Sequence, residues 1–266
     1  GMLYQNQSDY SKALENYRKS LKINEELGDK KGIATNLVNM GTVYQEQSNY
    51  PRALEYFGRS LKINEKLGDK NGVAYNLGNI GIVYHIQSDY SKALKYYKKA
   101  LKMLEEIGNN NGVAVMLGNI GTMYKNLSDY PKALEYYGRA LKMNEELGSR
   151  ASVAYNLGNM GNAYQDQSNY SKALVYYRKA LTIDKELGNK SGVGRHLGNI
   201  GVMYFMLAQD SVSINPKELN KYISLDQSVN LNKSIKYLLQ AIDVFKEIGE
   251  LNSRSKSFRT LADAYE

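Results

Sequence analysis

An asparagine recurs every forty residues in this chain, always inside the motif LGNIG or a close variant of it. Its side-chain amide offers one hydrogen-bond acceptor and two donors, which suits the peptide bonds of an extended partner. Glycine and asparagine both disfavour a helix interior, yet the flanking residues have helical character. A requirement stronger than helix propensity must therefore act at this motif. The series comprises Asn39, Asn79, Asn119, Asn159 and Asn199.

Residue types that support catalysis or metal binding are scarce. The chain has no cysteine, which excludes disulfides, thiolate metal sites and a cysteine nucleophile. Its two histidines, His85 and His196, lie in different repeats and have no acidic or nucleophilic partner at a recognisable spacing. No phosphate-binding loop, metal motif or nucleophile elbow occurs. We therefore expect a protein that is not an enzyme and that uses no cofactor or metal.

The forty-residue period extends over most of the sequence. Residues 31–70 and 151–190 agree at 20 of 40 positions without a gap, which coincidence cannot explain. Residues 1–30 match the last three-quarters of a unit. The complete units are 31–70, 71–110, 111–150 and 151–190, and a fifth begins at 191.

Each unit contains two helical segments. In the unit at 71–110, apolar residues from Val73 to Tyr84 recur at spacings of three and four, which predicts a helix over about 70–87. A similar stripe predicts a second helix over about 90–107. Capping residues mark both ends of this second helix in every unit. The predicted N-caps are Asn49, Asp89, Asp129 and Asn169, and the predicted C-terminal glycines are Gly28, Gly68, Gly108, Gly148 and Gly188.

These positions resemble the pattern of the tetratricopeptide repeat (TPR) family. At 71–110 the pattern is Leu77-x2-Ile80-Gly81-x2-Tyr84-x8-Ala93-x3-Tyr97-x2-Ala100, and it recurs in the neighbouring units. Usual TPR units have about 34 residues. The 40-residue form is similar to repeats of Pins-type adaptors and of bacterial TPR signalling proteins. The resemblance implies an all-α fold, namely a right-handed superhelical solenoid of antiparallel helix pairs.

The resemblance also implies which residues face a ligand. In a TPR array the first helix of each unit lines a concave groove, and the second helix forms the convex outside. The asparagines would then form a ladder along the groove, with specificity set by the residues around them. Only Lys125 and Arg195 could grip a C-terminal carboxylate, so a carboxylate ligand is disfavoured. Besides the asparagines, the expected groove residues are Tyr75, His85, Lys125, Tyr155, Asn162, Gln165 and Arg195.

The two glycines of the motif have different expected roles. The second, for example Gly81, would let the first helix approach the second closely, against Ala93 and Ala100. The first, for example Gly78, would face the groove. Its missing side chain leaves room either for a ligand backbone or for a crowded neighbouring helix, and the sequence leaves both explanations open.

The pattern breaks once, after Tyr204. The next alanine position of a second helix returns only at Ser234, so we expect an insertion at 205–230 with a short helix in PKELNKYI. The domains are then tandem TPR units at 1–204, this insertion, and a segment at 231–266. That last segment holds the second helix of the interrupted unit and the first helix of a truncated one. Because both chain ends fall inside a first helix without a polar cap, we expect a fragment of a longer array.

The net charge of +8 raises the question of an anionic partner. The lysines and arginines gather on the second helices, where a solvated outer face explains them, and most tyrosines occupy core positions. Nucleic-acid binding through this convex face is therefore a weak alternative. No apolar run approaches the length of about 20 residues that a membrane span needs, and no signal peptide is evident. We expect no membrane partner for this segment and a cytoplasmic location.

Together these features predict a non-enzymatic protein–protein interaction module. A peptide or protein partner would lie in the concave groove, and the module would act as a scaffold or sensor part of a larger signalling protein. The alternative is a regulatory or oligomerisation segment of a multidomain enzyme. Self-association through the open ends of the solenoid would accompany that alternative.

Overall fold

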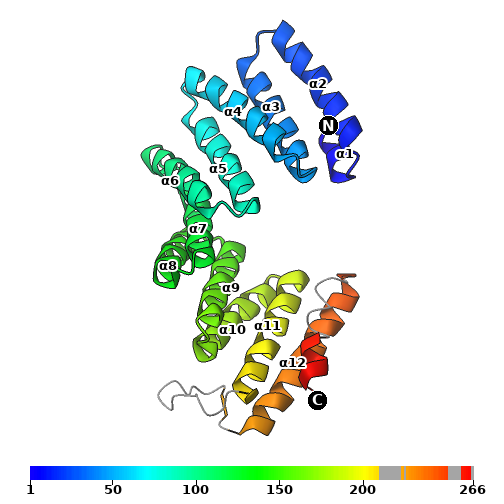
Figure 1. The fold of residues 1–266 in the computed structure, drawn as a ribbon, viewed down its shortest axis with the longest axis vertical. Helices are drawn as coiled ribbons and strands as arrows, with labels where there is room; N and C mark the ends of the chain where they lie inside the picture. Colours follow the sequence, from blue (N-terminus) through cyan, green and yellow to red (C-terminus); the bar gives the residue numbers. More distant parts are fainter. Residues whose placement is uncertain (210–222, 225, 251–258, 265–266) are drawn as a thin grey trace. The chain divides into compact units, whose positions relative to one another are not determined.

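The computed structural model describes residues 1–209, 223, 224, 226–250 and 259–264. All regular elements in these ranges are α-helices, which confirms the predicted all-α class (Figure 1). Residues 259–264 are helical as well. The helices are α1 (Met2–Asn6), α2 (Tyr10–Glu26), α3 (Lys30–Glu46), α4 (Tyr50–Leu67), α5 (Lys70–Ile86), α6 (Tyr90–Glu106), α7 (Asn110–Asn126), α8 (Tyr130–Glu146), α9 (Arg150–Asp166), α10 (Tyr170–Glu186), α11 (Lys190–Gln209) and α12 (Gln227–Glu247).

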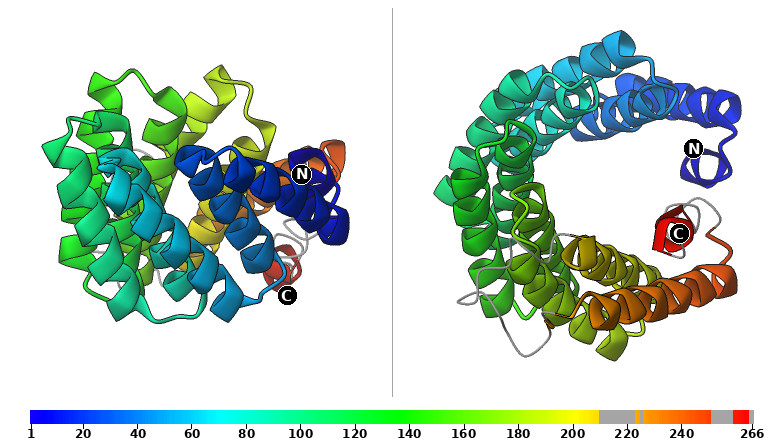
Figure 2. Two further views of the ribbon diagram at one scale, coloured as in Figure 1. Left: turned by 90° about the horizontal axis from the view of Figure 1, so that it is seen from above. Right: turned by 60° about the horizontal axis from the view of Figure 1, so that its bottom comes forward.

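The chain forms two compact units, Gly1–Leu127 (unit 1) and Ser128–Glu266 (unit 2). Within each unit, helices that follow one another in the sequence pack side by side as antiparallel pairs (Figure 2). In unit 1 the first helices of the repeats are α3, α5 and α7, and the second helices are α2, α4 and α6. In unit 2 the first helices are α9 and α11, and the second helices are α8, α10 and α12. This pairing is the predicted repeat architecture.

The predicted caps of the second helices are confirmed. Asp89 caps α6 by accepting a hydrogen bond from the backbone N–H of Lys92 at 3.0 Å, and Asn49, Asp129 and Asn169 act in the same way. The predicted C-terminal glycines all have φ between 67° and 69°. Only glycine adopts this left-handed conformation without a steric cost, so these five positions end the second helices.

The turn inside each repeat contains a strained serine that the sequence analysis did not anticipate. Ser88 has φ of 60°, and the equivalent serines at 8, 48, 128 and 168 have φ between 56° and 60°. The backbone N–H of Ser88 donates to the carbonyl of His85, and that of Asp89 donates to the carbonyl of Tyr84, both at 2.9 Å. These two bonds close the end of the first helix and offset the cost of the left-handed serine.

The second glycine of the LGNIG motif packs against the second helix of its own repeat, as predicted, but its nearest neighbour is an aromatic ring. A Cβ atom built on Gly81 would lie 2.6 Å from Tyr97 Cε1. Gly161 faces Tyr177 at the same distance, and Gly41 faces Phe57 at 2.7 Å. These rings are fully buried. The missing side chain therefore makes room for the ring, whereas the sequence analysis named Ala93 and Ala100.

The first glycine of the motif faces a neighbouring first helix. A Cβ on Gly78 of α5 would contact Met116 of α7 at 3.5 Å, and a Cβ on Gly158 of α9 would lie 2.7 Å from His196 of α11. Crowding between first helices therefore explains Gly158, whereas Gly78 makes an ordinary contact and lines a cavity, so both explanations stay open at Gly78.

The segment after Tyr204 differs in part from the predicted insertion. Residues 205–209 continue α11, and α12 begins at Gln227, four residues before the expected restart, with Asp226 as its N-cap. The predicted short helix in PKELNKYI falls almost wholly outside the described residues. In α12, Ser234, Leu238 and Ala241 are buried at the positions that the repeat pattern assigns to the core.

Adding a methyl group at Gly81 should destabilise unit 1. The new Cβ would overlap the Tyr97 ring, so Gly81→Ala must displace the ring or α5, and we expect a loss of roughly 1–3 kcal/mol in the free energy of unfolding. Gly58→Ala is the matched control, because open space surrounds that position and alanine favours a helix interior by about 1 kcal/mol. Urea unfolding followed by circular dichroism measures both variants, and equal midpoints would contradict the packing role of Gly81.

Candidate functional site

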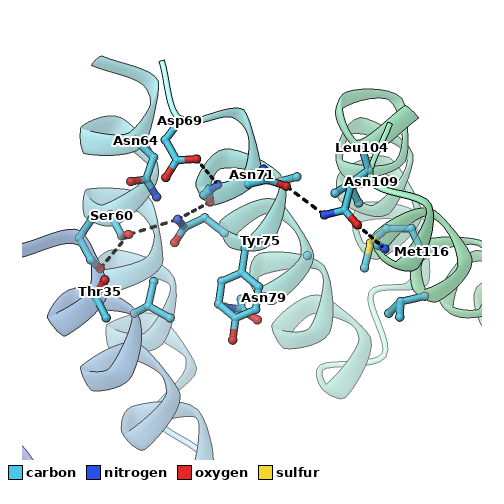
Figure 3. A pocket seen from close by; sticks show the side chains of 18 of the residues that line it. Thr35, Ser60, Asn64, Asp69, Asn71, Tyr75, Asn79, Leu104, Asn109 and Met116 are labelled. Atoms are coloured by element: carbon cyan, nitrogen blue, oxygen red, sulfur yellow. Dashed lines mark hydrogen bonds between the residues drawn. The ribbon is translucent and has the colours of Figure 1, made fainter. Parts of the chain in front are cut away.

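A cavity of about 850 Å³ opens on the face that the first helices of unit 1 form (Figure 3). Three predicted asparagines line it, Asn39 from α3, Asn79 from α5 and Asn119 from α7, together with the predicted Tyr75. Each asparagine is half-buried. The structure thus brings four of the predicted groove residues into one site.

Of the three predicted asparagines that line this cavity, Asn79 has an unsatisfied polar atom. Its Nδ2 is buried and has no hydrogen-bond partner among the described residues. Asn159, which occupies the same register in unit 2, also has a buried Nδ2 without a protein partner. An unpaired buried donor costs about 1–3 kcal/mol, so a ligand that accepts its hydrogen bond would recover this energy.

A second row of asparagines, missed by the sequence analysis, lies one turn earlier on the first helices. Asn76 is fully buried, and its Nδ2 donates to Ser60 Oγ at 3.1 Å and to the carbonyl of Gly72 at 2.8 Å. Ser60 Oγ donates in turn to the carbonyl of Ala34 at 3.0 Å, so this network connects α3, α4 and α5 (Figure 3). The row recurs with the forty-residue period as Asn36, Asn76 and Asn156, which was the signal available in the sequence.

Asn76 and Asn79 each have a buried polar atom without a hydrogen-bond partner among the described residues. These atoms are the Oδ1 of Asn76 and the Nδ2 of Asn79. Both residues line the same cavity. The two atoms are shielded from solvent, so a ligand would reach them only once the side chains turn toward the cavity; an acceptor and a donor would then suit the N–H and C=O groups of a peptide main chain.

The remaining walls of the cavity are largely apolar and carry little charge. Tyr75 and Val115 are 61% and 57% exposed. Leu104 of α6 and Met116 of α7 also line the cavity (Figure 3). Lys31 and Asp69 are the charged residues among those that line the cavity, and Asp69 caps α5 by accepting from the backbone N–H of Gly72 at 3.0 Å. The lining therefore favours a neutral ligand with apolar side chains.

The other predicted residues of unit 1 lie away from this cavity. His85 Nε2 is 3.4 Å from Asn126 Nδ2, and neither His85 nor Lys125 lines the cavity. Burial lowers the pKa of His85, and the positive charge of Lys125 lowers it further. His85 is therefore neutral at pH 7, and its Nε2 can form a hydrogen bond with Asn126 Nδ2.

In unit 2, two predicted groove residues have an internal role. The hydroxyl of buried Tyr177 donates to Asn162 Oδ1 or Gln165 Oε1, each at 2.7 Å. Burial raises the pKa of Tyr177, so this phenol remains protonated as the donor. Of the remaining predicted residues, Tyr155 and Arg195 are exposed on the first helices and Asn199 is half-buried.

An ionisable pair stands in place of two buried amides between α10 and α11. Asp184 and His196 occupy the positions of Asn144 and Asn156 in the preceding repeat. His196 Nε2 lies 3.2 Å from Asp184 Oδ2, and each side chain is 2% exposed. Burial lowers the pKa of His196, the neighbouring charge of Arg195 lowers it further, and Asp184 opposes both effects. His196 is consequently neutral in the folded protein at pH 7.

The described residues contain neither a metal-binding cluster nor a membrane-spanning helix. No group of three or more His, Asp or Glu side chains in this part of the chain could hold a metal ion. Among its helices, none combines the length and the apolar character that crossing a membrane requires.

Comparison with known proteins identifies the repeat. The tetratricopeptide repeat model matches residues 1–66, 32–106, 72–146 and 112–186, and a Sel1 repeat model matches residues 223–243. No curated protein matches the chain in sequence.

Several solved structures share the fold at low sequence identity. BtubC (BKLC) from P. vanneervenii has a TM-score of 0.74 at 18% identity, over 90% of this chain and 92% of that protein. A STAND protein with a tetratricopeptide repeat sensor, PH0952 from Pyrococcus horikoshii, has a TM-score of 0.76 at 21% identity, over 94% of this chain and 36% of that protein. A Rap protein complexed with Competence and Sporulation Factor has a TM-score of 0.62 at 18% identity, over 99% of this chain and 72% of that protein.

The Asp184–His196 pair should make stability fall at mildly acidic pH. An unfolded histidine titrates near 6.5, whereas His196 has a lower pKa in the folded protein. Between these two values the unfolded chain binds more protons, so stability is present above about pH 6.5 and is lost as the pH falls. We expect the urea midpoint to be lower at pH 5 than at pH 7.

Variants that copy the preceding repeat isolate this effect. In a His85→Asn background His196 is the one histidine that remains, and Asp184→Asn with His196→Asn restores the residue types of positions 144 and 156. We expect this triple variant to lose most of the difference between pH 5 and pH 7. An undiminished difference would show that other groups cause the pH dependence.

Proposed function

Because the chain belongs to the tetratricopeptide repeat family, whose repeats form protein-binding modules, we propose that it binds an extended peptide segment along the first helices of unit 1. The observation that carries this proposal is the cavity that contains the unpaired Oδ1 of Asn76 and the unpaired Nδ2 of Asn79. A peptide main chain supplies a donor and an acceptor together. Bound there, it would satisfy both buried groups at once.

The lining of the cavity indicates the kind of peptide. Main-chain contacts by asparagine amides hold a peptide without demanding particular side chains. The exposed Tyr75 and Val115, together with Met116, would contact apolar side chains of the peptide. The absence of a cation cluster among the lining residues makes a neutral, internal segment a better ligand than a terminal carboxylate.

Similar folds support a role in recognition. The Rap protein of similar fold was solved with Competence and Sporulation Factor bound, so a helical repeat array of this shape can take up a factor of that kind. The likeness is one of fold, at 18% identity. The STAND protein with a repeat sensor is much longer than this chain, which covers 36% of it. We therefore infer that this chain is the recognition part of a larger signalling protein, as a scaffold or a sensor, and that any catalysis lies in other modules.

Replacing Asn79 tests the proposal, because this substitution should not destabilise the fold. Since Asn79 Nδ2 has no protein partner, Asn79→Ala should keep or raise the stability of unit 1. We would select 12-residue peptides, blocked at both ends, from a random library on the wild-type chain and measure their affinity by fluorescence anisotropy. We expect Asn79→Ala to weaken binding about tenfold or more, which corresponds to about 1.4 kcal/mol.

Asn16→Ala is the matched control. Asn16 lies on the second helix α2 of the same unit, where its Nδ2 donates to the carbonyl of Lys12 at 2.8 Å. This variant should bind the selected peptides with unchanged affinity. If Asn79→Ala binds them as tightly as the wild type does, the peptides do not use the cavity and the proposal fails.

A further inference from the structure

A second cavity lies in unit 2, between the second helices α10 and α12. Its volume is about 360 Å³. Three lining residues are cationic and none is acidic, in contrast to the nearly neutral cavity of unit 1. The polar residues that line it are Arg178, Thr182, Lys185, Lys236, Tyr237 and Gln240.

Arg178 is held in a fixed position at this cavity. Its Nη2 donates to the hydroxyls of Tyr204 and Tyr237, at 2.9 Å and 2.8 Å. The guanidinium carbon lies over both rings, 5.3 Å from the centroid of Tyr237 and 5.9 Å from that of Tyr204. The two rings are stacked with their centroids 5.7 Å apart. A cation that is already ordered loses little entropy when it binds a ligand.

One of the two lysines is a departure from the repeat. Lys185 occupies a position that carries glutamate in all four earlier repeats, at Glu25, Glu65, Glu105 and Glu145. The position of Lys236 is glutamate in three repeats, at Glu15, Glu55 and Glu135, lysine in one, at Lys95, and valine in one, at Val175. A carboxylate that the earlier repeats share is therefore replaced by a cation at Lys185, and Lys236 adds a second cation to the same cavity.

The charge pairs of the repeat are also lost at this point. In α2, Glu15 pairs with Lys19 at 2.6 Å, and in α4, Glu55 lies 3.9 Å from Arg59. The equivalent pair in α12 is Lys236 and Gln240. Neither Lys185 nor Lys236 has an ion-pair partner within the described residues. Two exposed ammonium groups thus border the same cavity as Arg178 without a carboxylate to balance them.

We propose that this cavity between α10 and α12 binds a small phosphate-bearing anion, held by Arg178, Lys185 and Lys236. A guanidinium and two ammonium groups supply donors and positive charge, which an acceptor-only oxyanion with two or more negative charges complements. The cavity lies on second helices, whereas the peptide cavity lies on first helices. Binding of this anion is therefore independent of the proposed peptide recognition.

Calorimetry with sodium pyrophosphate tests the site on the full chain. At constant ionic strength we expect saturable binding with one site per chain. The variant Lys185→Glu with Lys236→Glu introduces glutamates that earlier repeats carry at these two exposed positions, so its fold should be unchanged by circular dichroism. We expect its affinity to fall at least about tenfold, because two charge-assisted hydrogen bonds are lost and two negative charges are added.

Lys62→Glu with Lys142→Glu is the control. It makes the same change in net charge at exposed lysines of α4 and α8, and it should keep the affinity for pyrophosphate. Sodium malonate in place of pyrophosphate should bind at least tenfold more weakly. Absence of saturable binding, an equal loss in the control variant, or equal affinity for malonate would each overturn the proposal.

Discussion

Contact between a glycine and a buried aromatic ring organises every complete repeat for which this packing is described. Gly41 meets Phe57, Gly81 meets Tyr97 and Gly161 meets Tyr177, in each case too closely for a Cβ atom. The ring can be fully buried only because the first helix has no side chain at this point. Packing of this ring outweighs the cost of about 1 kcal/mol for glycine inside a helix. In these three pairs the close approach of the two helices depends on this contact, and in α11 the equivalent Gly201 packs against Leu238 instead.

Two buried positions lie where successive repeats meet, one on a second helix and one on the next first helix, and the residue types at both positions differ from junction to junction. Asn64 and Asn76 are buried at one junction, Leu104 and Met116 replace both at the next, and Asp184 and His196 replace both at the last. A buried polar group needs a polar partner, and these partners differ between junctions: Asn76 donates to Ser60 and to the carbonyl of Gly72, whereas His196 lies 3.2 Å from Asp184. At the junction with Leu104 and Met116 the cavity of unit 1 becomes apolar on one side. The same two positions thus give one repeat an apolar wall and another an ionisable pair.

The two faces of the helix pairs carry different chemistry. The first helices present amides, and in unit 1 they enclose a cavity with few charges. Lysines and arginines of the second helices lie over tyrosine rings of the first helices, for example Arg52 over Tyr44 and Lys92 over Tyr84. The weak alternative of nucleic-acid binding through the convex face rests on charge alone. In unit 2 the cations Arg178, Lys185 and Lys236 line one cavity between second helices.

The sequence by itself determined the period, the helix pairs and the caps, because helix ends and apolar stripes depend on residues three or four positions apart. The resemblance to the repeat family predicted twelve groove residues, of which Asn39, Asn79, Asn119 and Tyr75 line the cavity of unit 1. Tertiary structure decided which amide atoms remain unpaired. Asn76 Nδ2 is satisfied by Ser60 of another helix, whereas Asn162 or Gln165 accepts from Tyr177. Such partners depend on the packing of separate helices, and spacing along the chain does not reveal them.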